Sequence, residues 1–263
     1  MLVRALVHSH QLGAAKEKTL QLVIARVWLL RKIPLIDDLT RSPVPSGSNV
    51  MIEFEPTSQW YNSSLTMAAG WSKQGGDVGY NGFAQPSDRV RTQLTALGLN
   101  LDELERDDLL LILDWYTPTL GRKSKDGIDS LKVADLSIEF RIRDDPNDTD
   151  PEWTGTLRIA DNFSTLARFN DEKSWVEFML TRVFPLAPAT KSTLVFGIMK
   201  GVHSEWAYRQ LEGSADGVVE FRLRDVGEET RDVMQIRSMR NVHYNRELTE
   251  LRIDENFLVQ IKI

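Results

Sequence analysis

Hydrophobic and polar positions follow two periodic patterns along this chain, and from Val50 onward the two patterns alternate. Short runs of apolar and β-branched residues predict strands, and stretches with apolar residues three and four positions apart predict helices. Strands that alternate with helices are typical of parallel βαβ units. The pattern therefore predicts an α/β fold with a largely parallel central sheet flanked by helices.

The pattern also assigns approximate bounds to the elements. We expect strands over Val50–Phe54, Val78–Phe83, Leu109–Leu113, Thr156–Ala160 and Thr193–Met199. We expect helices over Ser63–Ser72, Pro86–Leu97, Ile128–Arg143 and Trp175–Val183. After Asp216 the sequence pattern becomes typical of β-hairpins. We expect strands over Gly217–Leu223, Asp232–Ile236, Leu248–Ile253 and Phe257–Ile263.

The N-terminal residues do not fit this alternation. Within Thr19–Leu30, the spacing of the apolar residues fits a helix, whereas β-branching favours a strand, so both interpretations stay open. We assign residues 1–31 to an N-terminal extension, for which a loosely packed terminus is the simplest interpretation, and residues 32–263 to one domain.

Composition narrows the class of protein. With 263 residues, 41% of them hydrophobic and 27% charged, the chain is long and apolar enough for a large core. It has no cysteine, which excludes disulfides, thiolate zinc sites and a thiol nucleophile. The net charge of -6 and pI near 5.4 argue against a protein that binds mainly to nucleic acid. No apolar run is long enough to cross a bilayer, so we expect a cytoplasmic protein without a membrane partner.

Four passages, found in the same order, resemble the KaiC-like and RadA-related ATPases of the RecA type. They are Ile33–Leu39 with Pro45–Glu53 (similar to "GIPxLDxL" and "GGxIPxGSNVLIxG"), Leu97–Leu104 ("LGWDLxEL"), Gly201–Glu205 with Ser214–Val219 ("GVxSxE…LADGVI"), and Ile236–Arg240 ("KMRG"). The resemblance spans roughly Ile33 to Arg252. It implies a RecA-like P-loop fold that binds ATP and Mg²⁺ and assembles into oligomers.

The family's phosphate loop has the pattern G-x-x-x-x-G-K-[ST], whose glycines, lysine and hydroxyl hold the phosphates and Mg²⁺. The aligned residues here are Phe54, Glu55, Pro56, Thr57, Ser58, Gln59, Trp60 and Tyr61. Phe54 and Gln59 replace the glycines, Trp60 replaces the lysine and Tyr61 replaces the hydroxyl residue. We identify Phe54, Thr57, Ser58, Gln59, Trp60 and Tyr61 as a degenerate phosphate loop.

These replacements bear directly on nucleotide binding. Each lost charge-assisted hydrogen bond costs about 1.5–3 kcal/mol, so we expect ATP affinity to fall by at least about two to three orders of magnitude. We therefore expect no cofactor, with weak binding of ATP and Mg²⁺ in a rearranged pocket as the alternative. We favour Trp60 and Tyr61 as fillers of the vacated pocket over Trp60 as an exposed anchor for a partner.

The resemblance also locates the catalytic carboxylates. Ala84 and Gln85 stand where the family has two glutamates, and neither can act as a general base. Asp161 stands at the Walker B position. It is either an outer ligand of Mg²⁺ or a carboxylate that caps the loop Asn162–Ser164, and we favour the cap.

In the strand similar to "KMRG", Ser238 replaces the lysine, and Arg240 retains the arginine that the family points at a neighbouring subunit's phosphate. For Arg240 we favour a surface or interface salt bridge over nucleotide sensing. Arg122, Lys123 and Lys125 form a small basic cluster that is either a nucleic-acid contact or, as we favour, a solvated loop. We expect no metal site, because His8 and His10 lack nearby ligands and the run Asp144–Asp150 lacks EF-hand spacing.

Three functional hypotheses follow. The first is a non-catalytic paralogue, or pseudo-ATPase, that acts as a protein-interaction or regulatory subunit in a homo-oligomer or in a complex with a related RecA/KaiC-like subunit. The second is an ATP-binding KaiC-like ATPase with a rearranged pocket. The third is a mediator of DNA recombination that works with a RadA-like recombinase, and it depends on the basic loop and on family analogy alone.

Overall fold

A nine-stranded sheet forms the centre of the computed structural model, which describes residues 31–127 and 155–262. The strand order is β3-β2-β4-β5-β1-β6-β7-β8-β9. Strands β3 to β6 in this order pair in parallel, and β6 to β9 pair antiparallel. The predicted fold class, a largely parallel sheet with C-terminal hairpins, is confirmed.

The strands are β1 (Asn49–Phe54), β2 (Val78–Gly82), β3 (Leu110–Asp114), β4 (Leu157–Ala160), β5 (Thr193–Met199), β6 (Gly217–Val226), β7 (Glu229–Met239), β8 (Thr249–Ile253) and β9 (Val259–Ile261). The α-helices are α3 (Trp60–Lys73), α4 (Ser87–Ala96), α5 (Leu101–Arg106), α6 (Tyr116–Thr119), α8 (Glu172–Phe178), α9 (Leu186–Thr190) and α10 (Glu205–Ser214). Two 3-10 helices, η1 (Asp37–Leu39) and η3 (Phe163–Arg168), and a π-helical turn, η4 (Met179–Val183), complete the described elements.

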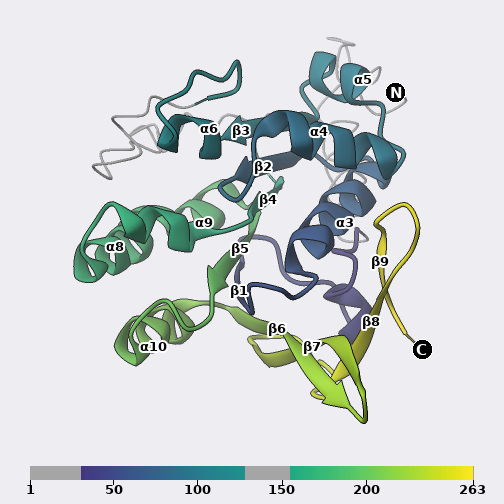
Figure 1. The fold of residues 1–263 in the computed structure, drawn as a ribbon, viewed down its shortest axis with the longest axis vertical. Helices are drawn as coiled ribbons and strands as arrows, with labels where there is room; N and C mark the ends of the chain where they lie inside the picture. The colour runs from purple at the N-terminus through teal and green to yellow at the C-terminus, as the bar shows by residue number, and fades with distance from the viewer. Residues whose placement is uncertain (1–30, 128–154, 263) are drawn as a thin grey trace, which may run out of the picture.

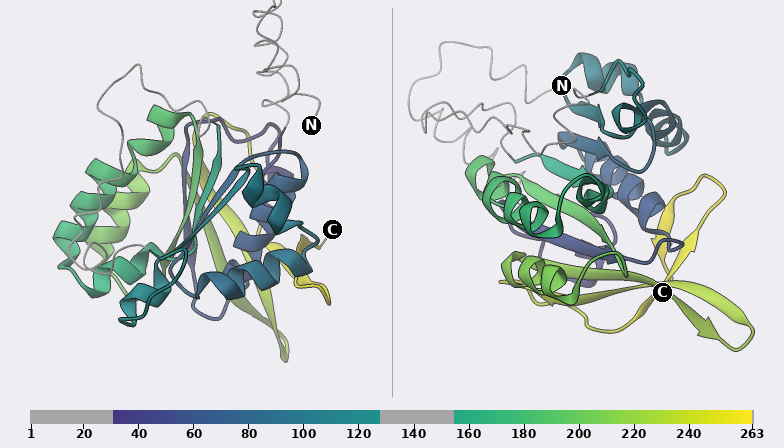
Figure 2. Two further views of the ribbon diagram at one scale, coloured as in Figure 1. Left: turned by 90° about the horizontal axis from the view of Figure 1, so that it is seen from above. Right: turned by 60° about the vertical axis from the view of Figure 1, so that its left-hand side comes forward.

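Helices cover both faces of the parallel part of the sheet (Figure 1; Figure 2). On one face, Val50, Ile52 and Phe54 of β1 belong to the core cluster that includes α3 and α4. On the other face, Met51 of β1 belongs to the cluster that includes α8 and α10. All six residues of β1 are buried, as expected for a strand covered on both sides.

Several element bounds differ from the prediction. Helix α3 begins at Trp60, three residues before the predicted start, because the loop after β1 turns directly into it. Strand β2 ends at Gly82 because the N–H of Phe83 donates to the Asp161 carboxylate. The single helix predicted over Trp175–Val183 is α8 followed by η4. The β6–β7 hairpin is longer than predicted at its tip.

Some predictions concern residues outside the described ranges. These are the N-terminal extension (apart from Arg31), the helix expected over Ile128–Arg143 and the acidic run Asp144–Asp150. None of the helices within 31–127 and 155–262 is long and apolar enough to span a bilayer.

Candidate functional site

The candidate site lies where β1 turns into α3, at the carboxyl edge of the parallel strands. Five residues, Glu55 to Gln59, connect the two elements. The N–H and hydroxyl of Ser58 both donate to the Glu55 carbonyl, at 3.0 and 2.7 Å. The Glu55 carboxylate accepts a 2.8 Å hydrogen bond from the N–H of Leu223 on β6. The loop is therefore closed on itself and tied to the neighbouring strand, while Thr57 is exposed at its tip.

Trp60, the first residue of α3, is completely buried. Its indole N–H donates a 2.7 Å hydrogen bond to the main-chain oxygen of Asp161, at the end of β4. Its ring centroid lies 5.5 Å from that of Phe221 on β6 and 6.1 Å from that of Phe54 on β1. Trp60 thus joins α3 to three strands from inside the protein, so the interpretation of Trp60 as an exposed partner anchor is wrong.

Tyr61 extends the aromatic contacts of the loop. Its ring packs edge-on against Phe54, with centroids 5.4 Å apart, and its hydroxyl accepts a 3.2 Å hydrogen bond from the Asn162 amide. Burial, aided by the nearby Asp161 carboxylate, raises the pKa of Tyr61 above its ordinary value. The hydroxyl is therefore protonated throughout the physiological range.

A carboxylate of the chain itself lies at the amino end of α3. The main-chain N–H of Gln59, which precedes the helix, donates a 3.0 Å hydrogen bond to Oδ1 of Asp232 on β7. Partial burial raises the pKa of Asp232, although the hydrogen bond from Gln59 opposes that rise. A helix amino terminus attracts anions through its free N–H groups and its dipole. Asp232 supplies an anionic partner for this terminus from within the chain.

Asp161 acts as a buried cap on two loops, of which the sequence indicated one. Its side chain is fully buried, and Oδ1 accepts hydrogen bonds from the N–H groups of Phe83 (2.7 Å) and Ala84 (3.2 Å). The predicted cap on Asn162–Ser164 is present in part. The Asp161 carboxylate also accepts a hydrogen bond from the N–H of Asn162, whereas the N–H of Ser164 donates to the Asn162 side chain at 3.1 Å. Strand β4 lies beside β2, so the carboxylate reaches the loop after the adjacent strand. Burial raises the pKa of Asp161 to about 7.

Comparison with known proteins places this site in a family. A family model described as "ATPase: KaiC" matches residues 33–262. The chain belongs to the KaiC ATPase family. No curated protein matches its sequence.

Two solved structures share the fold of this KaiC-family chain. One is the KaiC-like protein PH0186 from Pyrococcus horikoshii OT3, with a TM-score of 0.64 and 14% identity over 89% of this chain and 97% of that one. The other is the flagellar accessory protein FlaH from Methanocaldococcus jannaschii, with a TM-score of 0.66 and 15% identity over 89% of this chain and 99% of that one. At these identities the likeness shows the RecA-type fold alone.

Arg240 does not reach the β1–α3 loop of its own chain. It directly follows β7, and its guanidinium donates to the Gly213 carbonyl at 2.7 Å and lies 4.0 Å from the Asp216 carboxylate. The register pairs Gly217 with Met239 and with Val50, so Arg240 lies at the amino edge of the parallel strands. The loop lies at the opposite edge. The favoured surface salt bridge of Arg240 is therefore present, although it is long.

The basic cluster is also remote from the loop. Arg122, Lys123 and Lys125 are exposed in the segment that follows α6, beside the outer strand β3. Strands β2, β4 and β5 separate β3 from β1. The structure therefore does not bring this cluster to the candidate site of the KaiC-family domain.

The sequence did not reveal an ion-pair network that links β1 to β7 and α10. A bulge in the β6–β7 pairing leaves Arg237 unpaired, and its guanidinium contacts the carboxylates of Glu53 (2.8 Å) and Glu212 (2.9 Å). Lys200 pairs with Glu220 nearby. Burial and the adjacent Glu212 raise the pKa of Glu53 to about 7. The partners are far apart in the sequence, and no local spacing indicates the network.

A second unpredicted cluster surrounds His203. Its imidazole stacks on Trp175, with centroids 4.3 Å apart and planes at 11°, and Nε2 lies 2.8 Å from the Ser164 hydroxyl. Nδ1 lies 3.6 Å from the Glu172 carboxylate. The Ser164 oxygen also accepts from the N–H of Met199, and Ser164 is buried. The arrangement of serine, imidazole and carboxylate resembles a catalytic triad, but the serine is buried and cannot reach a substrate. The cluster instead holds η3, α8 and the end of β5 together.

The described residues contain no group of three or more His, Cys, Asp or Glu side chains arranged to hold a metal ion. Burial lowers the pKa of His203, and the nearby Glu172 carboxylate opposes that fall.

Proposed function

We propose that this KaiC-family domain is a non-catalytic subunit that works in the cytoplasm through contacts with other proteins. The observation that carries the proposal is the burial of Trp60. At the position where the family resemblance places a phosphate-binding lysine, the indole ring fills the interior and its N–H is bonded to Asp161. An apolar ring in this place supplies neither charge nor a free donor to a phosphate.

Two further features support the same proposal. The Asp232 carboxylate lies at the amino end of α3, where it repels rather than attracts phosphate oxygens. Ala84 and Gln85 follow β2, where the family resemblance places the glutamates, and neither side chain can take a proton from an attacking water. Binding of a triphosphate and activation of water are thus both impaired.

Equilibrium dialysis with Mg²⁺–ATP, run beside a phosphate-release assay, tests this proposal. We expect no saturable binding below millimolar ATP and no hydrolysis above the background. Thr57→Glu adds a negative charge at the exposed tip of the loop, and Thr230→Glu adds one at the exposed tip of the β6–β7 hairpin. Micromolar ATP binding that Thr57→Glu weakens and Thr230→Glu leaves intact would replace this proposal with the ATP-binding alternative.

The partner in this proposal is a second copy of the chain or a related RecA/KaiC-like subunit. The family resemblance implies assembly into oligomers, and Arg240 is exposed at the edge of the sheet opposite the loop. Size-exclusion chromatography with light scattering, on the chain alone and mixed with a related subunit, tests the assembly. A chain that stays monomeric in both experiments contradicts the interaction role without bearing on ATP binding.

A further inference from the structure

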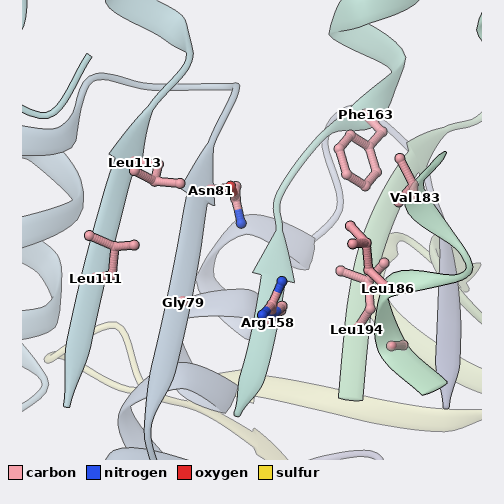
Figure 3. Close-up of a pocket in the computed structure, with 10 residues that line it drawn as sticks. Gly79, Asn81, Leu111, Leu113, Arg158, Phe163, Val183, Leu186 and Leu194 are labelled. Atoms are coloured by element: carbon pink, nitrogen blue, oxygen red, sulfur yellow. The ribbon is translucent and has the colours of Figure 1, made fainter. Parts of the chain in front are cut away.

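The face of the sheet that carries α8, α9 and α10 has an apolar groove and a polar notch. The groove, of about 260 Å³, has Leu111 and Leu113 of β3 on one side and Leu186 and Leu194 on the other (Figure 3). The notch, of about 380 Å³, lies between α10 and β7 and is lined by Arg209, Glu212, Gly213, Val218, Arg237 and Ser238. Glu212 and Arg237 both belong to the ion-pair network of Glu53. The notch therefore gives solvent access to one side of that network.

The last turn of α10 holds two arginines of the neighbouring β7 segment. The Glu212 carboxylate lies 2.9 Å from the guanidinium of Arg237 on β7. The carbonyl of the next residue, Gly213, accepts a 2.7 Å hydrogen bond from Arg240, which directly follows β7. Leu211, in the same turn, is completely buried and packs in the core. The position of this turn therefore determines where both guanidinium groups lie.

Glu53 lies on the central strand β1, and its side chain is 4% exposed. Oε2 of Glu53 accepts a 2.8 Å hydrogen bond from Nη1 of Arg237, the same nitrogen that contacts Glu212. The carboxyl group of Glu212 is also close enough for a hydrogen bond with that of Glu53. Oε1 of Glu53 is buried and accepts no hydrogen bond from any residue in the ranges 31–127 and 155–262. A buried oxygen without a donor is destabilising, and a proton on Glu53 turns this carboxyl group into a donor toward Glu212.

Titratable and charged side chains lie around Glu53 on each of the elements that pack against it. They are Glu220 and Arg222 of β6, which lie 3.9 Å apart, Arg237 of β7, Lys200 after β5, and Tyr208, Arg209 and Glu212 of α10. Lys200 pairs with Glu220, and Arg209 pairs with Glu205. These two cations are therefore occupied by carboxylates other than Glu53.

The charges in contact with the two carboxyl groups do not balance when both groups are ionised. Within the described ranges, Arg237 is the one cation that contacts both Glu53 and Glu212. A single positive charge shared by two carboxylates leaves a buried negative charge in excess, which favours a proton on one of them. Burial and the hydrogen bond with Glu212 raise the pKa of Glu53 to about 7, although Arg237 and Lys200 oppose the rise. The proton is therefore bound and released close to neutral pH.

We propose that a proton shared by Glu53 and Glu212 holds the last turn of α10 against the sheet, and that loss of this proton releases the turn. Strand β1 is paired on both sides, so Glu53 stays in place when it ionises. Glu212 is 26% exposed beside the notch, so it moves into water and takes the turn with it. The release frees Arg240 from Gly213, at the edge of the sheet that we propose for assembly. That last consequence depends on the proposed function, whereas the proton switch does not.

Hydrogen–deuterium exchange of the full-length chain at pH 6 and pH 8 tests the switch, with each rate divided by the intrinsic rate at that pH. The pKa of Glu53 is raised in the folded protein, so the proton stabilises the closed turn below neutral pH and is lost as pH rises through about 7. We expect the protection of residues 209–215 to fall about tenfold from pH 6 to pH 8. At pH 8 helix α3, on the opposite face, should stay better protected than this turn, because the opening is local. Unchanged protection of the turn, or a fall to the same level in α3, overturns the proposal.

Two glutamine variants test which group carries the proton. Glu53→Gln cannot ionise, and in Glu212→Gln the charge of Arg237 balances the one remaining carboxylate, so in both the protection of the turn should be nearly equal at pH 6 and pH 8. Because Glu212 is partly exposed, Glu212→Gln tests the proposal even where Glu53→Gln does not fold. Asp161→Asn is the matched control: it removes another carboxyl whose pKa burial raises to about 7, and it should retain the tenfold fall. A tenfold fall that persists in a folded glutamine variant, or that disappears in Asp161→Asn, contradicts the shared proton.

Discussion

Gly197, in the middle of β5, lies directly beneath the indole nitrogen of Trp60. A Cβ atom at Gly197 would lie 2.5 Å from Nε1 of Trp60 and 2.3 Å from the main-chain oxygen of Asp161. These two atoms are the donor and acceptor of the hydrogen bond that joins α3 to β4. Only glycine leaves room for that bond, which explains a glycine inside an otherwise apolar central strand.

Gly197→Ala is therefore expected to destabilise the protein. The added methyl group meets a main-chain oxygen that cannot swing away, and overpacking of this kind costs about 1–3 kcal/mol. Urea unfolding measures the change in the free energy of unfolding. Gly213→Ala is the control: a Cβ there meets nothing within 4 Å, and alanine favours a helix, so α10 should be unaffected or slightly more stable. An equal loss of stability in both variants would contradict the close contact.

The same contact predicts coupling between Gly197 and Trp60. Trp60→Leu removes the indole N–H and leaves a cavity, which costs about 2–5 kcal/mol as for other large-to-small core changes. In that background Gly197→Ala should cost less, because one of its two colliding atoms is gone. The cost should not vanish, because the Asp161 oxygen remains. A double-mutant cycle measures this coupling, expected at about 0.5–3 kcal/mol, and strict additivity would rule it out.

Asp161 gives a pH-dependent contribution to stability. Its pKa is raised from 3.8 to about 7 in the folded protein by burial. Between those values the folded state binds a proton that the unfolded state has lost, so stability falls as pH rises through this window. Asp161→Asn keeps an acceptor for the N–H groups of Phe83 and Ala84 but removes the titration. Its free energy of unfolding, measured by urea between pH 5 and 8, should vary less with pH than that of the natural protein.

Glu53 and Asp37 add to the same trend, since burial raises their pKa to about 7 and about 6. The difference in the pH dependence of the free energy of unfolding between Asp161→Asn and the natural protein isolates the contribution of Asp161, because both proteins retain the other two carboxyls. A matching pH profile in the two proteins would show that Asp161 does not titrate in this range.

The sequence predicted the strands well because their signal is local. The run Thr193–Met199 is apolar and β-branched, and β5 has these bounds. The family resemblance correctly identified the turn between β1 and α3, and the size of Trp60 indicated that it fills space there. The order of the strands across the sheet is not contained in any single run, and the sequence did not predict it.

The remaining parts of the site depend on contacts between distant residues. Gln59 and Asp232 are 173 positions apart, and Glu53 and Arg237 are 184 apart. No local spacing indicates such pairs. The cap that Asp161 makes on Phe83 and Ala84 was not predicted for the same reason: the residues that follow Asp161 are its neighbours in sequence, whereas Phe83 is a neighbour only through the pairing of β4 with β2.

Asp232→Asn tests whether the chain supplies its own anion to the amino end of α3. Asparagine keeps an acceptor for the Gln59 N–H but removes the negative charge, and an anion at a helix amino terminus is worth about 0.3–1 kcal/mol. Burial of the charge, which raises the pKa of Asp232, offsets this gain, so we expect little change in Tm in a chloride buffer. Sulfate or phosphate should raise the Tm of this variant more than that of the natural protein, because an added anion can take the vacated position. Asp225→Asn, on the exposed part of the β6–β7 hairpin, should respond to sulfate as the natural protein does. If sulfate raises the Tm of all three proteins equally, the amino end of α3 is closed to anions whether or not Asp232 is charged. Trp60 and the closed loop are then sufficient to exclude a phosphate.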